Sequence, residues 1–132
     1  MLTVIPIQDK NTQRELLELC GIDFDIDAFA YKAEDGGFLG AIQFKFVDGI
    51  GEISGFNYAP GTKDNEAMII MLRTAMNFMF RCGIKSSTLN VATSSEELIK
   101  LSGYSRLTDN IYSIDLEKFY ISPCHFAPKD NK

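Results

Sequence analysis

The spacing of hydrophobic and polar residues along the chain has two different periods. Alternation at every second residue over Phe29–Glu34, Phe38–Phe46 and Ile50–Tyr58 predicts three strands. Asp35-Gly36-Gly37 and Asp48-Gly49 lie between these segments and are typical of tight turns. The central part of the chain is therefore predicted to form an antiparallel meander.

Three segments have the period of a helix. The first lies at about residues 11–20, and the second, Glu66–Arg81, is apolar almost all round, so it should lie flat on a sheet. A third helix is predicted to begin at Ser94, which stands at capping-box spacing from Glu97, and to end near Gly103.

The remaining apolar segments predict three further strands, Thr3–Ile7, Ser87–Ala92 and Ile111–Leu116. The second of these follows a helical crossover, so it should run parallel to its neighbour in space. The tail Phe119–Phe126 could add a seventh strand or pack as an irregular cover. The expected fold is a single α+β domain over residues 1–132, with a mixed, mostly antiparallel central sheet flanked by helices.

Composition excludes several classes of function. The 132 residues suffice for one hydrophobic core, and a net charge of −5 provides no broad basic field for nucleic acid or an anionic membrane. No run of about 18 apolar residues exists that could span a bilayer. Three widely spaced cysteines suit reduced thiols better than a disulfide framework. A cytoplasmic protein with no nucleic-acid or membrane partner is expected.

Metal and hydrolase chemistry are not expected either. His125 is the only histidine, and together with the adjacent Cys124 it cannot complete a zinc site. One histidine near the end of the chain also makes a Ser/His/Asp or Cys/His hydrolase improbable.

A strand that leads through a turn into a helix is a common place to bind an anion. Gly51 and Gly55 lie on the strand, Pro60-Gly61 forms the break, and the first N–H groups of the following helix have no partners within that helix. Asp64 and Glu66 place negative charge at the same position. They can instead cap the helix, an interaction worth about 0.5–2 kcal/mol.

The order of elements and three local matches resemble the GCN5-related N-acetyltransferase (GNAT) family over Ala28–Leu116. Glu52–Pro60 is similar to the family's fourth strand, which ends in a proline before the pyrophosphate loop. Cys82-Gly83-Ile84 followed by Leu89-Asn90-Val91 resembles the stop of the central helix and the fifth strand. Leu98–Tyr104 resembles the late helix that ends in Gly-Phe or Gly-Tyr.

The resemblance implies acetyl-CoA as co-substrate. In the family the fourth and fifth strands splay apart, and the pantetheine arm lies between them; Gly55 would mark a bulge at this point. The backbone of Phe56 and Tyr58 would meet the pantetheine amides. The turn facing the pyrophosphate would include Lys63, Asn65, Glu66, Ala67 and Met68. The alternative is that Gly55 is a kinked edge-strand glycine and Phe56 a core side chain.

The loop departs from the family pattern of Arg or Gln, two residues, Gly, one residue, then Gly or Ala. The corresponding residues are Lys63, Glu66 and Met68. Glycines let phosphate oxygens approach the backbone, whereas the Met68 side chain is expected to fill that space. Binding of CoA is therefore expected to be weak, or to depend on a different anchor.

The reaction of the family needs a base for the ammonium and an acid for the departing thiolate. By resemblance to some histone-acetylating members, Glu52 is the candidate base, and alternation places it on one face with Phe56 and Tyr58. It could instead be a solvated strand glutamate. The position of the family's usual acidic tyrosine is Ile99, so Tyr104, Tyr58 or water would replace it, and Tyr104 is the candidate acid.

The leading hypothesis is acetyl transfer from acetyl-CoA to a primary amine on a small molecule or peptide. The alternative is a catalytically silent GNAT-fold protein that serves as a protein- or small-ligand-binding module. The first helix joins the second strand by a short connection, which leaves an open acceptor groove or room for a partner subunit, such as a homodimer. Asp23, Asp25 and Asp27 in this connection could form an acidic rim for an amine or an exposed polar face.

Overall fold

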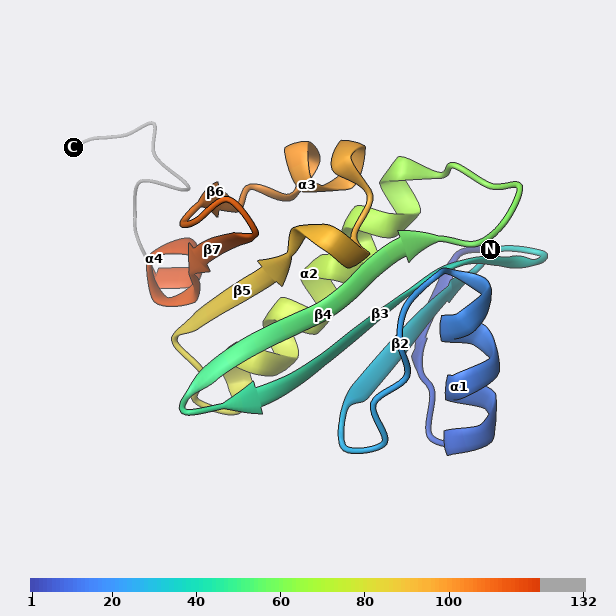
Figure 1. The fold of residues 1–132 in the computed structure, drawn as a ribbon, viewed down its shortest axis with the longest axis horizontal. Helices are drawn as coiled ribbons and strands as arrows, with labels where there is room; N and C mark the ends of the chain where they lie inside the picture. Colours follow the sequence, from blue (N-terminus) through green and yellow to red (C-terminus); the bar gives the residue numbers. More distant parts are fainter. Residues whose placement is uncertain (122–132) are drawn as a thin grey trace.

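The computed structural model describes residues 1–121, which form a mixed seven-stranded sheet with helices on both faces (Figure 1). The strand order is β1-β2-β3-β4-β5-β7-β6, and every neighbouring pair is antiparallel except β4 and β5. The predicted α+β class is confirmed. The elements are β1 (Thr3–Pro6), α1 (Lys10–Leu19), β2 (Phe29–Glu34), β3 (Phe38–Val47), β4 (Ile50–Tyr58), α2 (Asn65–Arg81), β5 (Ser86–Asn90), the 3-10 turn η1 (Val91–Thr93), α3 (Glu96–Ser102), β6 (Ser105–Arg106), β7 (Ile111–Asp115) and α4 (Leu116–Ile121).

The two faces of the sheet are covered unequally. Helix α2 crosses one face against β1 to β4, and α3 and α4 pack beside it (Figure 1). Within the described residues the other face carries only α1, which packs on β3. The part of this face formed by β4, β5 and β7 is therefore left open by the helices. In the described chain no helix combines the length and the apolar character that crossing a membrane requires.

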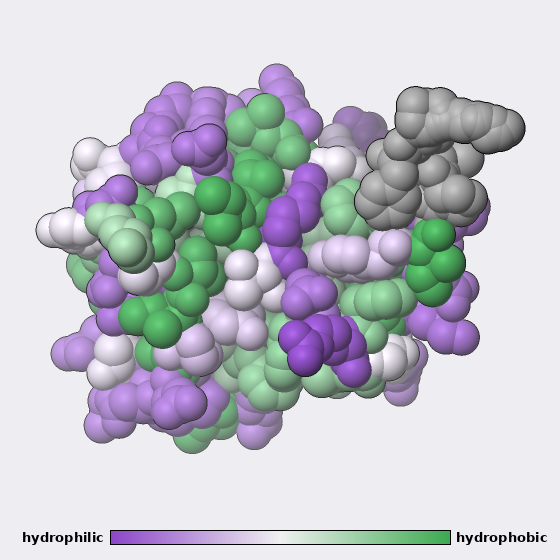
Figure 2. All heavy atoms as spheres, turned by 180° about the vertical axis from the view of Figure 1, so that it is seen from behind, coloured by the Kyte–Doolittle hydropathy of each residue, from purple (hydrophilic) through white to green (hydrophobic). Residues whose placement is uncertain are grey.

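Helix α2 is held by apolar contacts around most of its circumference, as its sequence predicted. The buried side chains that it contributes to the main core are Met68, Met71, Leu72, Ala75, Met76 and Met79. Burying a side chain of methionine or leucine size contributes about 1.5–3 kcal/mol. Seen from the α2 side, apolar residues gather over the half of the molecule that carries β1 (Figure 2). Ile5, Phe29 and Ile70 stay about half exposed.

Strand β4 contains a bulge at Ser54. Gln43 pairs with Gly55 and Phe44 with Ile53, so Ser54 is an extra residue between two registered pairs. The sequence predicted a bulge at Gly55, one residue further along. Gly55 has a different role: a Cβ there would lie 2.4 Å from Ile22, so only glycine lets this side chain pack against the strand.

The bulge reverses which face the following residues present. Ile53 and Phe56 both enter the core on the α2 side, although they are three positions apart. A Cβ added at Gly51 would lie 2.5 Å from Met79 of α2, so the next residue, Glu52, faces the opposite side. The expectation that Glu52 shares a face with Phe56 and Tyr58 is therefore wrong, because it assumed unbroken alternation.

Strands β4 and β5 begin as parallel neighbours and then separate. Their ladder joins Ile50–Ile53 to Ser86–Leu89. Beyond it, the next contact is a single parallel bridge between Phe56 and Ser94, past the 3-10 turn. The predicted pair of strands that diverge at one end is confirmed.

The C-terminal part differs from the prediction in several places. The predicted strand Ser87–Ala92 ends at Asn90, where the turn η1 follows, and the short strand β6 was not predicted. The N-cap of α3 is Ser95 rather than Ser94, and its side chain makes no capping hydrogen bond, so the predicted capping box is absent. The helix does end at Gly103, which has left-handed backbone angles. The start of the segment Phe119–Phe126 belongs to helix α4, and the rest of it lies outside the described residues.

Candidate active site

A row of polar side chains crosses the open face of the sheet where β4 and β5 begin to separate. Lys45, Glu52, Thr88 and Ser113 are lateral neighbours on β3, β4, β5 and β7. A hollow of about 170 Å³ lies over this row. It is lined by Lys45, Glu52, Ile53, Ser54, Thr88, Asn90 and Ile111. The carboxylate of Glu52 is thus beside a small, solvent-open cavity at the point of divergence.

Lys45 connects this hollow to the loop between α1 and β2. Its Nζ lies 2.9 Å from Oδ2 of Asp25. The hydrogen bond from Lys45, with a second from the Asp27 amide, lowers the pKa of Asp25. In return Asp25 raises the pKa of Lys45, with a smaller contribution from the charge of Glu52. Lys45 therefore stays positive between the loop carboxylate and the strand carboxylate.

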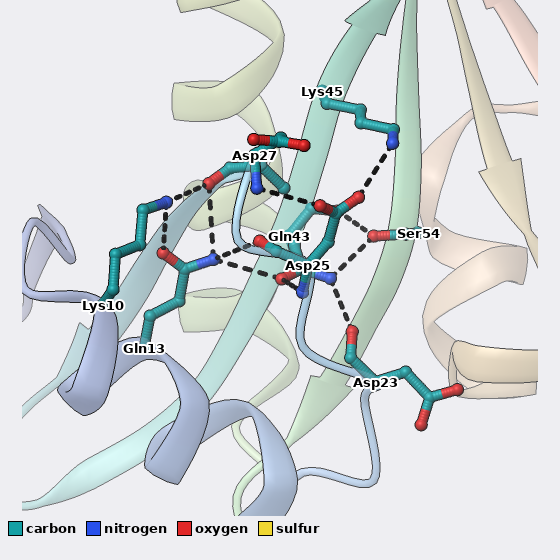
Figure 3. Close-up of polar contacts among 9 residues, drawn as sticks. Lys10, Gln13, Asp23, Asp25, Asp27, Gln43, Lys45 and Ser54 are labelled. Carbon is teal, nitrogen blue, oxygen red and sulfur yellow. Dashed lines mark hydrogen bonds and ion pairs between the residues drawn. The ribbon is translucent and has the colours of Figure 1, made fainter.

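The same loop is held by hydrogen bonds to Gln43 of β3 (Figure 3). The Gln43 side chain is fully buried. Its Oε1 accepts hydrogen bonds from the Gln13 side chain at 3.1 Å and from the Asp25 amide at 3.0 Å. Its Nε2 donates to the Asp23 carbonyl at 2.8 Å and to the Ser54 hydroxyl at 3.0 Å. One side chain thus joins α1, the loop and the bulge of β4.

Sequence reasoning did not identify Gln13 or Gln43. The available signal was a glutamine among the apolar residues of β3 and another on the buried side of α1. A polar residue at a core position requires buried partners, since an unsatisfied amide is costly. Here the partners are the backbone of the Asp23–Ala28 loop. The loop carrying Asp23, Asp25 and Asp27 is therefore a fixed wall of the open face.

On its other side, the edge of β4 is occupied by residues that follow β5. The Thr93 hydroxyl donates to the carbonyl of Ser54, and the Ser95 N–H donates to the carbonyl of Phe56 at 3.2 Å. The Tyr58 N–H is taken by the side chain of Asn57 at 3.0 Å. Phe56 itself is a fully buried core side chain. The Phe56 carbonyl and the Tyr58 N–H, which belong to the backbone predicted to meet a pantetheine arm, thus have partners within the chain.

Some groups at the N-terminus of α2 also have partners within the chain. Asp64 accepts a hydrogen bond from the Ala67 N–H at 3.0 Å, so the capping role considered from the sequence is confirmed. Glu97, from α3, accepts from Asn65 at 2.7 Å and pairs with Lys63 at 2.8 Å. The hydroxyl of Tyr58 donates to Asn65.

Proton affinities follow these contacts. The hydrogen bond from Lys63, and then the one from Asn65, lower the pKa of Glu97, while Glu97 raises the pKa of Lys63. Burial raises the pKa of Tyr58, and the Glu97 charge adds to this. Lys63, the cation predicted to face a pyrophosphate, is therefore paired with a carboxylate at this end of α2.

Glu66 and Met68, the two residues that depart from the family's small residues, lie in different environments. Glu66 is exposed in the first turn of α2. Met68 is fully buried, and its thioether packs against Gly40, where a Cβ would lie 2.4 Å from the sulfur. The expectation that its side chain fills the phosphate space is wrong, because the helix turns position 68 toward the sheet.

Tyr104, the candidate acid, lies behind the sheet. Its hydroxyl donates to Ser87 at 2.8 Å, and Ser87 donates to the Gly51 carbonyl at 2.7 Å. Burial raises the pKa of Tyr104 well above its usual value. Glu52 faces the open side and Tyr104 the α2 side, so the structure does not bring the two together. Ile99 is a buried core residue.

Within residues 1–121, no group of three or more His, Cys, Asp and Glu side chains could hold a metal ion. The adjacent Cys124 and His125, considered from the sequence, lie outside the described residues.

Comparison with solved structures finds the same fold in acetyltransferases. IAA acetyltransferase from Bacillus cereus ATCC 14579 superposes with a TM-score of 0.67 at 18% identity, covering 82% of this chain and 79% of the other. A GNAT-family acetyltransferase from Staphylococcus aureus Mu50 gives 0.64 at 12% identity, covering 88% and 99%. PaiA N-acetyltransferase from Thermoplasma acidophilum, in complex with coenzyme A, gives 0.64 at 15% identity, covering 87% and 99%.

No protein-family model matches the sequence, and no curated protein matches it. At identities below one fifth, the structural likeness establishes the fold and not the chemistry. The fold that the order of elements predicted is confirmed.

Proposed function

We propose that this chain, which has the fold of the GNAT acetyltransferases, transfers an acetyl group from acetyl-CoA to a primary amine. The observation that supports this proposal is the position of Glu52. Its carboxylate borders a solvent-open hollow where β4 and β5 separate, on the part of the sheet face that α1 leaves uncovered within the described residues. An amine can enter this hollow, and a carboxylate is there to take its proton.

In the proposed reaction, Glu52 accepts a proton from the ammonium of the acceptor. The neutral amine then attacks the thioester carbonyl, so a C–N bond forms and the C–S bond breaks. The CoA thiolate leaves and takes up, through water, the second proton, which the attacking nitrogen loses as the amide forms. Tyr104 has no part in this scheme because it lies on the other face of the sheet. Its role as the acid stays a prediction, and its position argues against that role.

For the co-substrate, the proposal keeps the backbone of Phe56 and Tyr58 and the turn of Lys63, Asn65, Glu66, Ala67 and Met68. Lys63 is the cation of this set, and Met68 would act through its backbone, since its side chain lies in the core. Hydrogen bonds from Ser95 and to Asp64 must be exchanged for contacts with the ligand. Acetyl-CoA affinity is therefore expected to be weak.

A second function, a catalytically silent binding module, is favoured by one observation. Partners within the chain already hold the β4 carbonyls of Ser54 and Phe56 and the Ala67 amide at the start of α2. Such a protein would use the open hollow to bind a small ligand or a protein without any transfer step.

Calorimetric titration with acetyl-CoA and with CoA separates the two functions. Thiol release would then be followed with polyamines, amino acids, aminoglycosides and lysine peptides as acceptors. Binding of acetyl-CoA together with amine-dependent thiol release supports the enzyme. Absence of binding and of release with every acceptor supports the silent module. Sedimentation velocity would test the predicted homodimer.

A further inference from the structure

Beyond the β4–β5 ladder, a short segment of the same chain lies along the edge of β4. Ser94 and Ser95 have extended backbone angles, and Ser94 forms a parallel bridge with Phe56. The segment therefore resumes the β4–β5 pairing beyond the gap. It does so with two hydrogen bonds, from the Thr93 hydroxyl and the Ser95 amide, to the carbonyls of Ser54 and Phe56.

The segment that makes this contact with β4 has several unfavourable features of its own. The 3-10 turn Val91–Thr93 buries none of its residues. The Ser94 hydroxyl is buried and has no hydrogen-bond partner among the described residues. Ser95 is the N-cap of α3 but gives the helix no side-chain hydrogen bond. A buried hydroxyl without a partner disfavours the closed arrangement.

The same short segment also closes the start of α2. Two residues after Ser95, Glu97 binds both Lys63 and Asn65. Moving the Thr93–Glu97 segment away from β4 would release these two side chains at the same time as the β4 carbonyls. One movement would thus free both the strand edge and the only lysine of the turn before α2.

We propose that Thr93–Glu97 is an intrachain latch that occupies the acetyl-CoA site and must be displaced before the co-substrate binds. The proposal rests on the proposed function, since it takes the edge of β4 as the place of the pantetheine arm. The proposal accounts for the unsatisfied hydroxyl of Ser94, because the closed segment is an imperfect substitute for the ligand. The latch lowers affinity for acetyl-CoA until it opens.

Ser95→Pro is the sharpest test of the latch. Ser95 has φ −64° and ψ 131°, and Ser94 before it has φ −131° and ψ 147°, so proline fits without strain and removes the N–H together with the hydroxyl. Ser95→Ala is the matched control, because it keeps the N–H while removing the hydroxyl, which contacts Tyr58. Thr93→Val removes the other latch hydrogen bond at nearly constant shape, with Thr93→Ser as its control.

The latch predicts that Ser95→Pro and Thr93→Val each bind acetyl-CoA about three- to tenfold more tightly by calorimetry, whereas Ser95→Ala and Thr93→Ser bind as the unmodified chain does. If all five proteins bind acetyl-CoA with equal affinity, the latch is overturned while the proposed co-substrate site stands. If none of them binds acetyl-CoA, both the latch and the proposed function are overturned. Circular dichroism of each variant confirms that the fold is retained.

Discussion

At the scale of single residues, Glu52 and Tyr104 lie on opposite faces of the sheet and should have separable effects. Replacing Glu52 by Gln preserves size and hydrogen bonding but removes the basic carboxylate. Turnover of an accepted amine should fall by about 10²–10⁴-fold, the contribution of general-base catalysis. The unfolding free energy should change little, since the side chain borders solvent. Steady-state thiol release measures the effect.

Glu18→Gln on the exposed surface of α1 is the control, and it should leave turnover unchanged. Wild-type turnover in Glu52→Gln would show that Glu52 is a bystander and that the base lies elsewhere.

The opposite result is expected for Tyr104→Phe. The substitution removes the hydrogen bond to Ser87 in the core, so the free energy of unfolding should fall by about 1 kcal/mol. Turnover should stay within a factor of about two, because the hydroxyl faces away from the hollow. Urea unfolding and thiol release measure the two quantities. A large loss of turnover with unchanged stability would restore Tyr104 as the acid.

At the scale of elements, the loop between α1 and β2 depends on Gln43. Gln43→Leu keeps the volume but leaves the Asp25 amide, the Asp23 carbonyl and the Gln13 side chain without this partner. The free energy of unfolding should fall by about 2 kcal/mol or more, since buried polar groups lose their hydrogen bonds. Hydrogen exchange at the Asp25 amide should accelerate as well.

Gln8→Leu, at an exposed position just before α1, is the matched control and should change neither quantity. Unchanged exchange in Gln43→Leu would mean that the loop is fixed by other contacts.

At the scale of the whole molecule, stability should fall at alkaline pH. Burial raises the pKa of Cys20 from 9.0 to about 11 and also raises that of Tyr104 above 10.0. The unfolded chain then loses these protons at lower pH than the folded chain does. Stability is therefore complete below about pH 9 and decreases as the pH rises toward 11.

Urea unfolding at about pH 7 and about pH 10 measures this decrease, and a Cys20→Ala, Tyr104→Phe double variant should show a smaller one. An equal decrease in the double variant would assign the effect to other groups.

The sequence by itself determined the main elements and their order, although not η1, β6 or α4. Alternation, helical spacing and turn residues are local properties, so they located β2 to β4, the long helix α2 and the stop at Gly103. The crossover connection also determined that β5 runs parallel to its neighbour. These features together were sufficient for the fold class.

Only the tertiary structure decided which way the candidate site residues face and what they contact. Side-chain alternation holds only while the ladder is regular, and the extra residue at Ser54 is defined by pairing with β3, which no local pattern encodes. The same limit applies to the hydrogen bonds of Gln43 with the loop and of Ser95 with β4. Their partners are distant in sequence, because a buried polar group is satisfied by whatever the packed fold brings beside it.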